Sequence, residues 1–168
     1  MILFETKRLI ARQIREEDKP TFLDFYNDQL VMRYISSGKA DWTSDELDRK
    51  LQMNKSLYSV GFGIYAVEQK QTGKVMGEAS VFNSFNDLKQ PEVGYIIARN
   101  YWNQKYGIEI VNGLINYCKH TLLAERIVAQ MYADNIYSAR LCKKAGMQLY
   151  EAAEFENGKQ KLSFHALF

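Results

Sequence analysis

Runs typical of strands and runs typical of helices alternate along the whole chain, and this alternation restricts the fold more than any other feature. Strand patterns are expected at about 8–13, 62–69, 74–82, 91–98, 126–132, 147–155 and 162–168. Helical patterns are expected at about 16–27, 44–58, 106–122 and 135–145. Only two of the 168 residues are proline, and no repeat or flexible linker marks a domain boundary. Interleaving of this kind predicts the α/β class, with one mixed sheet covered by helices.

Two local signals support individual elements. Thr43 and Glu46 have the spacing of a capping box, so the second helix is expected to begin just after Thr43. The pair Asn157-Gly158 favours a tight left-handed turn between the last two strands.

The charge balance argues against several classes of partner. Lys and Arg total 22 against 20 Asp and Glu, and the net charge of +2 gives no reason to expect nucleic acid or an anionic membrane. No stretch approaches the ~20 apolar residues of a membrane span, and the N-terminus lacks the apolar run of a signal peptide. Cys118 and Cys142 are expected as free thiols in a reducing cytoplasm. His120 and His165 stand alone, so neither metal ligation nor catalysis is expected of them.

One strand-to-helix junction, EVGYIIARNYWNQKYGIEI at 92–110, is the strongest candidate for a binding site. The helix is expected to begin near Tyr106. Its first backbone N–H groups lack partners there and, with the helix dipole, attract an anion such as phosphate. Gly107 would let the backbone approach a ligand closely. No P-loop or dinucleotide-binding glycine motif is present.

Four segments carry motifs that recur together in one protein family. The opening ETKRLIARQIREED carries Thr6, Arg8, Leu9 and Arg12, and LVMRYIS follows at 30–36. The loop before the third helix carries Trp102, Tyr106, Gly107 and Glu109. The segment ERIVAQMYADNIYSARLCKKAGM carries Asn135, Ser138, Lys144 and Gly146. Together they resemble the GNAT superfamily of acetyl-coenzyme A-dependent N-acetyltransferases, more narrowly the branch of ribosomal-protein N-terminal acetyltransferases.

The resemblance implies a GNAT fold, with a largely antiparallel sheet of about seven strands in a single N-acetyltransferase domain over 1–168. It implies acetyl-coenzyme A as cosubstrate, with its diphosphate in the loop 103–108 and its pantetheine arm between the splayed strands 91–98 and 126–132. A homodimer is plausible by family habit. The cofactor-binding residues that the resemblance implies are Ile97, Ala98, Asn103, Gln104, Lys105, Tyr106, Gly107, Ile108, Asn135 and Ser138.

Two positions depart from the family's loop motif, because Asn103 and Lys105 replace its two glycines. A Cβ at 105 would crowd the diphosphate unless the backbone there is helical and the side chain points into solvent. Alternatively, Lys105 supplies a charge to the phosphates.

The family's reaction, carried over by resemblance, is direct attack of a neutral amine on the acetyl thioester. Because an amine is mostly protonated near neutral pH, a general base is needed. Glu92 is the first candidate, with a solvated carboxylate as the plain alternative, and Glu78 is the second. Cys142 is the candidate proton donor to the departing thiolate, or else a small buried helix residue. Trp42, Tyr58 and Phe85 fall in segments that flank the family's acceptor cleft.

The acceptor stays open at this stage. It is either a peptide or protein N-terminal α-amine or a small-molecule amine. The alternative function is a non-catalytic module of the same fold that binds coenzyme A or a protein partner, which the altered glycine positions would favour.

Overall fold

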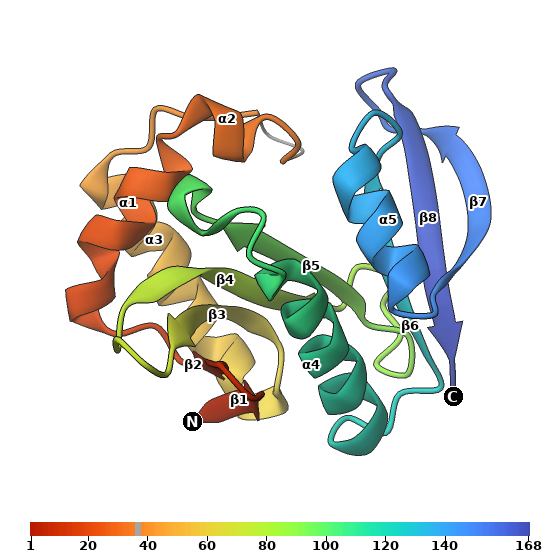
Figure 1. The fold of residues 1–168 in the computed structure, drawn as a ribbon, viewed down its shortest axis with the longest axis horizontal. Helices are drawn as coiled ribbons and strands as arrows, with labels where there is room; N and C mark the ends of the chain where they lie inside the picture. The colour runs from red at the N-terminus through yellow and green to blue at the C-terminus, as the bar shows by residue number, and fades with distance from the viewer. Residues whose placement is uncertain (36–37) are drawn as a thin grey trace.

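The computed structural model describes residues 1–35 and 38–168, which form one eight-stranded sheet with helices on both faces (Figure 1). The sheet order is β1-β2-β3-β4-β5-β6-β8-β7, and every neighbouring pair is antiparallel except β5 and β6. The strands are β1 Ile2–Glu5, β2 Leu9–Arg12, β3 Gly63–Gln69, β4 Val75–Phe82, β5 Glu92–Ile97, β6 Arg126–Tyr132, β7 Gln148–Glu154 and β8 Gln160–Leu167.

The prediction of about seven strands omits β1. Leu3 and Phe4 are adjacent and both buried, so this strand lacks the alternation by which the others were predicted. Phe4 packs against the helix over it at Gly113, where an added Cβ would lie 2.5 Å from the Phe4 ring. Glycine at 113 therefore lets the helix approach the edge of the sheet.

Within residues 1–35 and 38–168, five α-helices and three short 3₁₀ turns connect the strands. The α-helices are α1 Lys19–Tyr26, α2 Gln29–Met32, α3 Ser44–Lys55, α4 Tyr106–His120 and α5 Ile136–Lys144, and the 3₁₀ turns are η1 Glu16–Asp18, η2 Ser56–Val60 and η3 Arg99–Tyr101. The predicted capping box is present, since the Thr43 side chain accepts from the Glu46 N–H and Glu46 reaches back to Thr43. The short helix α2 was not predicted. Ser36, the last residue of the LVMRYIS motif, lies outside the described residues.

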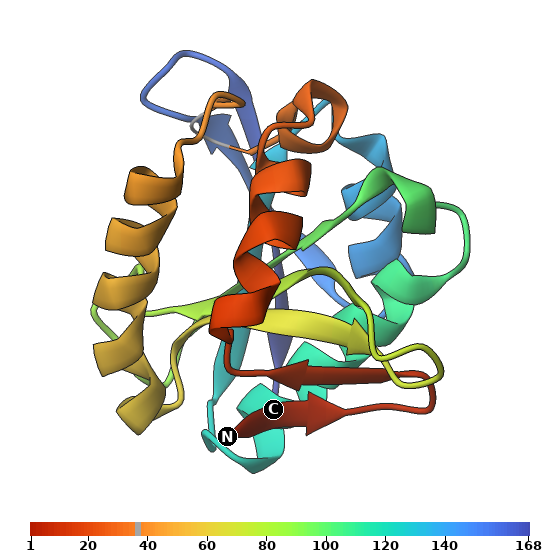
Figure 2. The ribbon, with the colours of Figure 1, turned by 90° about the vertical axis from the view of Figure 1, so that its left-hand side faces the viewer.

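The two faces of the sheet carry separate hydrophobic cores. Helices α1 and α3 run side by side on one face (Figure 2), where Phe22, Leu47 and Ile96 belong to one cluster. Helix α4 covers the other face, where Leu114 and Val93 belong to the second cluster. Alternate residues of β5 therefore face opposite layers.

The site is positioned by the divergence of β5 and β6. These parallel strands share a single paired position, Glu92 with Val128, next to a hydrogen bond of 3.0 Å from the Val128 N–H to the Pro91 carbonyl. Beyond it the unit of β6, β7, β8 and α5 leans away from β5 (Figure 1). Among the described residues, no helix is long and apolar enough to cross a bilayer.

Candidate active site

Two connected cavities open where β5 and β6 diverge. The loop chamber, about 530 Å³, is lined by residues 101–103 and 105–107, by the end of β5 and by parts of α2 and α5. The strand chamber, about 650 Å³, is lined by β4, β5, β6 and parts of α3 and α5. The residues that line both chambers are Tyr34, Ile35, Tyr95, Ile96, Asn135 and Ser138.

Most of the residues that the sequence assigned to the cofactor line the loop chamber. They are Ile97, Asn103, Lys105, Tyr106, Gly107, Asn135 and Ser138. Gln104 and Ile108 are not among its lining residues, and Ala98 lines a different cavity. Glu78, Glu92 and Cys142 line the strand chamber instead.

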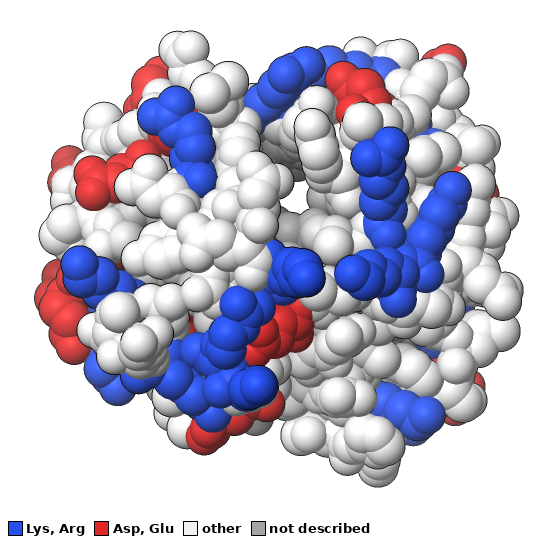
Figure 3. Space-filling view, viewed as in Figure 1, with Lys and Arg blue, Asp and Glu red and all other residues white. Residues whose placement is uncertain are grey.

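The loop chamber suits an anion. Helix α4 begins at Tyr106, so its unpaired N–H groups lie at this end of the chamber. The charged residues among its described lining are Arg33, Lys105 and Arg140, with no carboxylate. Lys and Arg side chains stand on both sides of the hollow between α2 and α5 (Figure 3). A helix N-terminus with three cations around it can hold a diphosphate.

The two replaced glycines keep a glycine-like backbone. Asn103 has φ 61° and Lys105 has φ 63°, both in the left-handed region. Asparagine tolerates this region, whereas lysine is strained there by roughly 1–2 kcal/mol. Lys105 is exposed and directly precedes α4, and it is also among the residues that line the loop chamber. A helical backbone at 105, which would have kept the Cβ away from a diphosphate, was one of the expectations. It is wrong, because the backbone there is left-handed.

Gly107 has a packing reason that the sequence did not reveal. A Cβ at this position would lie 2.6 Å from Cδ1 of Leu141 on α5. Glycine therefore lets α4 and α5 meet beside the chamber.

A brace from the N-terminal hairpin holds the first turn of α4. The Glu109 carboxylate accepts hydrogen bonds from Thr6 Oγ1 at 2.6 Å, from the Arg8 N–H at 2.8 Å and from Arg8 Nε at 2.7 Å. Burial raises the pKa of Glu109, but the bonds from Thr6 and Arg8 outweigh it and leave the pKa below its usual value. Thr6, Arg8 and Glu109 are all motif positions, and in the folded chain they are in direct contact.

Arg8 extends this brace to the loop itself. Its Nη1 donates to the Gln104 carbonyl at 3.1 Å, and its guanidinium lies 4.1 Å from the centre of the Tyr106 ring. The Tyr106 hydroxyl in turn accepts from Gln69 Nε2 at 2.6 Å. Arg8 is thus a positioning residue for the loop, and sequence reasoning assigned it no such role.

Asn135 and Ser138 begin α5 at the junction of the chambers. Asn135 Oδ1 accepts from the Ser138 N–H at 3.2 Å, which caps the helix. The Ser138 hydroxyl lies 3.1 Å from the Tyr95 hydroxyl, and burial raises the pKa of Tyr95 to about 12. Within the described part of the chain, the Asn135 amide N–H₂ has no protein partner and can donate to a ligand.

The strand chamber contains two carboxylates in different settings. Glu92 is half-buried at the point where β5 and β6 still pair, and no described side chain bonds it. Glu78 is 5% exposed and accepts a hydrogen bond from the Tyr26 hydroxyl. Lys50 Nζ donates to the same hydroxyl at 2.7 Å. Burial, followed by the negative charge of Glu78, raises the pKa of Tyr26 well above its usual value, so Tyr26 stays protonated.

Cys142 is both buried and part of the chamber lining. Its side chain is 2% exposed, and burial raises the pKa of its thiol to about 12. Both earlier interpretations, a proton donor or a small buried helix residue, are compatible with this position.

Of the three aromatic residues predicted to flank the acceptor, Trp42 alone lines the strand chamber. The Tyr58 hydroxyl donates to the Ile64 carbonyl at 2.9 Å, and its ring packs on Tyr65 within the core. Phe85 is exposed in the loop between β4 and β5 and is not among the lining residues.

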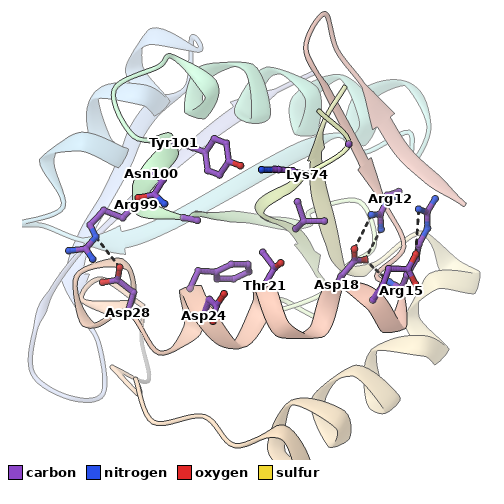
Figure 4. Close-up of a pocket in the computed structure, with 15 residues that line it drawn as sticks. Arg12, Arg15, Asp18, Thr21, Asp24, Asp28, Lys74, Arg99, Asn100 and Tyr101 are labelled. Carbon is purple, nitrogen blue, oxygen red and sulfur yellow. Dashed lines mark hydrogen bonds and ion pairs between the residues drawn. The ribbon is translucent and has the colours of Figure 1, made fainter. Parts of the chain in front are cut away.

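A further cavity of about 630 Å³ lies between α1, the β3–β4 turn and η3 (Figure 4). Its cations largely pair with its own acids: Arg12 binds Asp18 at 2.7 Å, and Arg99 binds Asp28 at 3.1 Å. Ala98 is the one predicted site residue among its lining. We assign no ligand to this cavity, because its strongest charges are already compensated.

Comparison with known proteins shows which family model and which relatives this chain matches. A family model described as acetyltransferase (GNAT) domain matches residues 8–148. YoaA, an uncharacterised N-acetyltransferase of Bacillus subtilis, is 26% identical over 147 residues, which cover 87% of this chain and 82% of YoaA.

Solved structures share the fold at low identity. A GNAT-family acetyltransferase from Bacillus anthracis has a TM-score of 0.88 at 19% identity, covering 99% of this chain and 98% of that one. Spermidine N-acetyltransferase from Vibrio cholerae, in complex with coenzyme A and spermine, has a TM-score of 0.82 at 18% identity over 96% of both chains. RimL, a ribosomal L7/L12 α-N-protein acetyltransferase in complex with coenzyme A, has a TM-score of 0.84 at 16% identity, covering 100% of this chain and 98% of that one.

Proposed function

The chain belongs to the GNAT acetyltransferase family, and on this premise we propose that it transfers the acetyl group of acetyl-coenzyme A to a primary amine within the cleft between β5 and β6. The acceptor is a peptide N-terminal α-amine or a small-molecule amine. The observation that carries the proposal is the divergence of β5 from β6 after one paired position, with the N-terminus of α4 at the loop chamber.

The loop chamber would hold the cosubstrate. The N–H groups of α4, with Lys105, Arg33 and Arg140 nearby, suit its diphosphate. The diverging edges of β5 and β6 offer backbone groups to the amides of the pantetheine arm. Asn135 keeps an amide N–H₂ free for the same arm after capping α5 through its oxygen. This arrangement directs the thioester toward the strand chamber.

Glu92 is the proposed general base. It stands where the strands begin to separate, so an acceptor amine beside the thioester would lie within its reach or one water away. Glu92 takes the proton of the ammonium, and the neutral amine attacks the thioester carbon. The nitrogen–carbon bond forms, the tetrahedral intermediate collapses with cleavage of the carbon–sulfur bond, and the nitrogen releases its second proton to water to give the neutral amide. Glu78 suits this role less, because Tyr26 already occupies one of its oxygens.

Cys142 is the proposed proton donor to the leaving thiolate. Its thiol is protonated near neutral pH, because its pKa lies at about 12. An ordinary thiol titrates near ~8.5, so this transfer is uphill and its contribution to rate is expected to be small.

The experiment is acetyl transfer by the purified protein with a panel of peptides and small amines, monitored as coenzyme A thiol release. Binding of acetyl-coenzyme A is measured alongside by calorimetry. Amine-dependent thiol release supports the proposal. Tight binding without transfer to any amine would favour the non-catalytic module. Absence of binding would limit the family relationship to the fold.

A further inference from the structure

Lys50 gives the strand chamber a cation that the proposed reaction does not use. The charged residues among the described lining of this chamber are Lys50, Glu78 and Glu92. Glu78 is 5% exposed and bonded by Tyr26, so it is largely hidden from a ligand. An acceptor would therefore meet Glu92 at one place and Lys50 at another.

The Lys50 ammonium contacts Tyr26 and Trp42. Its Nζ donates to Tyr26 at 2.7 Å and lies 4.2 Å from the centre of the Tyr26 ring and 5.0 Å from that of Trp42. The two rings are themselves 5.1 Å apart, so the ammonium stands over an aromatic pair. Among the described residues, no carboxylate forms an ion pair with Lys50. The Tyr26 hydroxyl stands between it and Glu78.

The hydrogen bonds of Lys50 are incomplete. An ammonium has three N–H donors, and in the described structure only the bond to Tyr26 uses one. Lys50 lines the chamber, so its remaining donors are available to a bound molecule. An ammonium with spare donors in a partly desolvated cavity favours a carboxylate oxygen, since a charge-assisted hydrogen bond is about twice as strong as a neutral one.

We infer that the acceptor is a zwitterion, a primary amine that also carries a carboxylate, with its amine at Glu92 and its carboxylate at Lys50. This inference rests on the proposed acetyl transfer and names the substrate class for it. The class is that of amino acids, including ω-amino acids with separated charges. A diamine or polyamine would place its second ammonium against Lys50, and this like-charge contact in a cavity disfavours such acceptors.

The test compares acceptors that differ only at the far end. A series of ω-amino acids from β-alanine to 6-aminohexanoate is assayed against the matching ω-amino amides and the diamines of equal length. At the acceptor chain length with the highest kcat/KM, the wild-type protein is expected to prefer the ω-amino acid over the matching amide by about tenfold or more in kcat/KM. The length that gives the largest ratio reports the separation of the two subsites.

Variants of Lys50 assign the preference to its charge. Lys50→Met is expected to bring the carboxylate-to-amide ratio close to one, mainly through KM, while Lys50→Arg keeps most of it. Lys55→Met, on an exposed position of the same helix, is the matched control and should leave the ratio unchanged. Thermal unfolding and acetyl-coenzyme A affinity of each variant separate a damaged fold from a lost subsite.

Three results would overturn the inference. They are an equal or better turnover of the diamines by the wild type, a carboxylate preference that survives Lys50→Met, and a similar loss of preference in Lys55→Met. A protein that binds acetyl-coenzyme A but acetylates none of these acceptors and no peptide or amine of the wider panel would overturn the proposed acetyl transfer as well. Transfer to peptides or polyamines alone would overturn only the inference about the acceptor.

Discussion

The loop chamber is lined by three short segments of the chain, 30–35, 95–107 and 135–141, whereas the strand chamber combines side chains from many separate positions. Nine lining residues of the loop chamber lie between 95 and 107, and the groups suited to an anion there include the backbone N–H groups at the start of α4. In the strand chamber, Lys50 from α3 meets Tyr26 from α1, and Tyr26 meets Glu78 from β4. The first design depends on backbone conformation, and the second on side-chain identity.

This difference predicts how the two chambers respond to substitution. A backbone site tolerates changes of side chain but depends on whatever holds the loop in place. A side-chain site loses its function when one group is changed, although the fold is kept. The variants below test this contrast.

The largest effect is expected at Glu92. Glu92→Gln keeps the size and polarity of the side chain but removes the base, so kcat/KM should fall by about a hundredfold or more. The affinity for acetyl-coenzyme A should stay within about twofold, because Glu92 lines only the strand chamber. Steady-state kinetics and calorimetry measure the two quantities, with exposed Glu125→Gln as the control. Unchanged kcat/KM in Glu92→Gln would show that Glu92 is not the general base and would leave Glu78 as the candidate.

The next effect is expected at Arg8, which contacts the loop without lining its chamber. Arg8→Ala removes the bonds to Glu109 and the Gln104 carbonyl and should weaken acetyl-coenzyme A binding by roughly tenfold. Because the Arg8 side chain is 39% exposed, the loss in unfolding free energy should be only about 1–2 kcal/mol. Calorimetry and urea unfolding check both, and exposed Lys7→Ala is the neighbouring control. Wild-type affinity in Arg8→Ala would show that the loop holds its conformation without the brace.

The part of the loop chamber that the strand-to-helix junction forms was predictable, because its signals are contiguous. The junction at 92–110 showed where a strand ends and a helix begins, and seven of the ten predicted cofactor residues line the chamber. Most elements were predicted for the same reason, since each periodic run is local. The strand β1 was missed because its buried residues are adjacent rather than alternating.

The strand chamber could be predicted only in part. Glu78, Glu92 and Trp42 were named as candidates from their segments, and all three line it. Nothing in the sequence joins Tyr26 to Lys50 and Glu78, which lie 24 and 52 positions away and meet only when α1 and α3 pack on the sheet. The brace of Arg8 on Glu109 spans 101 positions and was equally hidden, although both were motif residues.

A smaller kinetic effect is expected at Cys142. Cys142→Ala removes a proton donor whose pKa, at about 12, suits donation to a thiolate poorly. Its kcat should fall by less than about tenfold, while Cys142→Ser should restore part of the loss only if a hydroxyl can donate in its place. The measurement is kcat of the wild type and of both variants with one and the same amine. A fall comparable to that of Glu92→Gln would make the thiol an essential acid.

The brace should also make stability depend on pH. The pKa of Glu109 is lower in the folded protein than its ordinary value of 4.5, so its contribution is fully present above that value and is lost as pH falls through the folded pKa. Urea unfolding from about pH 6 down to about pH 3.5 should show that the difference in unfolding free energy between the wild type and Glu109→Gln becomes smaller as the pH falls. Other carboxylates titrate in both proteins and cancel in the difference. A gap that stays constant would mean that Glu109 is not stabilised by Thr6 and Arg8.

The smallest effect is expected at Lys105, and it separates the backbone of the loop from its charge. Lys105→Ala removes the charge but keeps a Cβ at φ 63°, whereas Lys105→Gly removes both. Relief of left-handed strain, worth about 1–2 kcal/mol, is partly offset by glycine's entropy cost of about 0.5–1 kcal/mol, so Lys105→Gly should be slightly more stable than Lys105→Ala. Because the lysine is exposed, both variants should lose only about two- to threefold in acetyl-coenzyme A affinity at low salt, and the loss should shrink as salt rises. A loss of tenfold or more in both, persisting at high salt, would instead place the ammonium directly on the diphosphate.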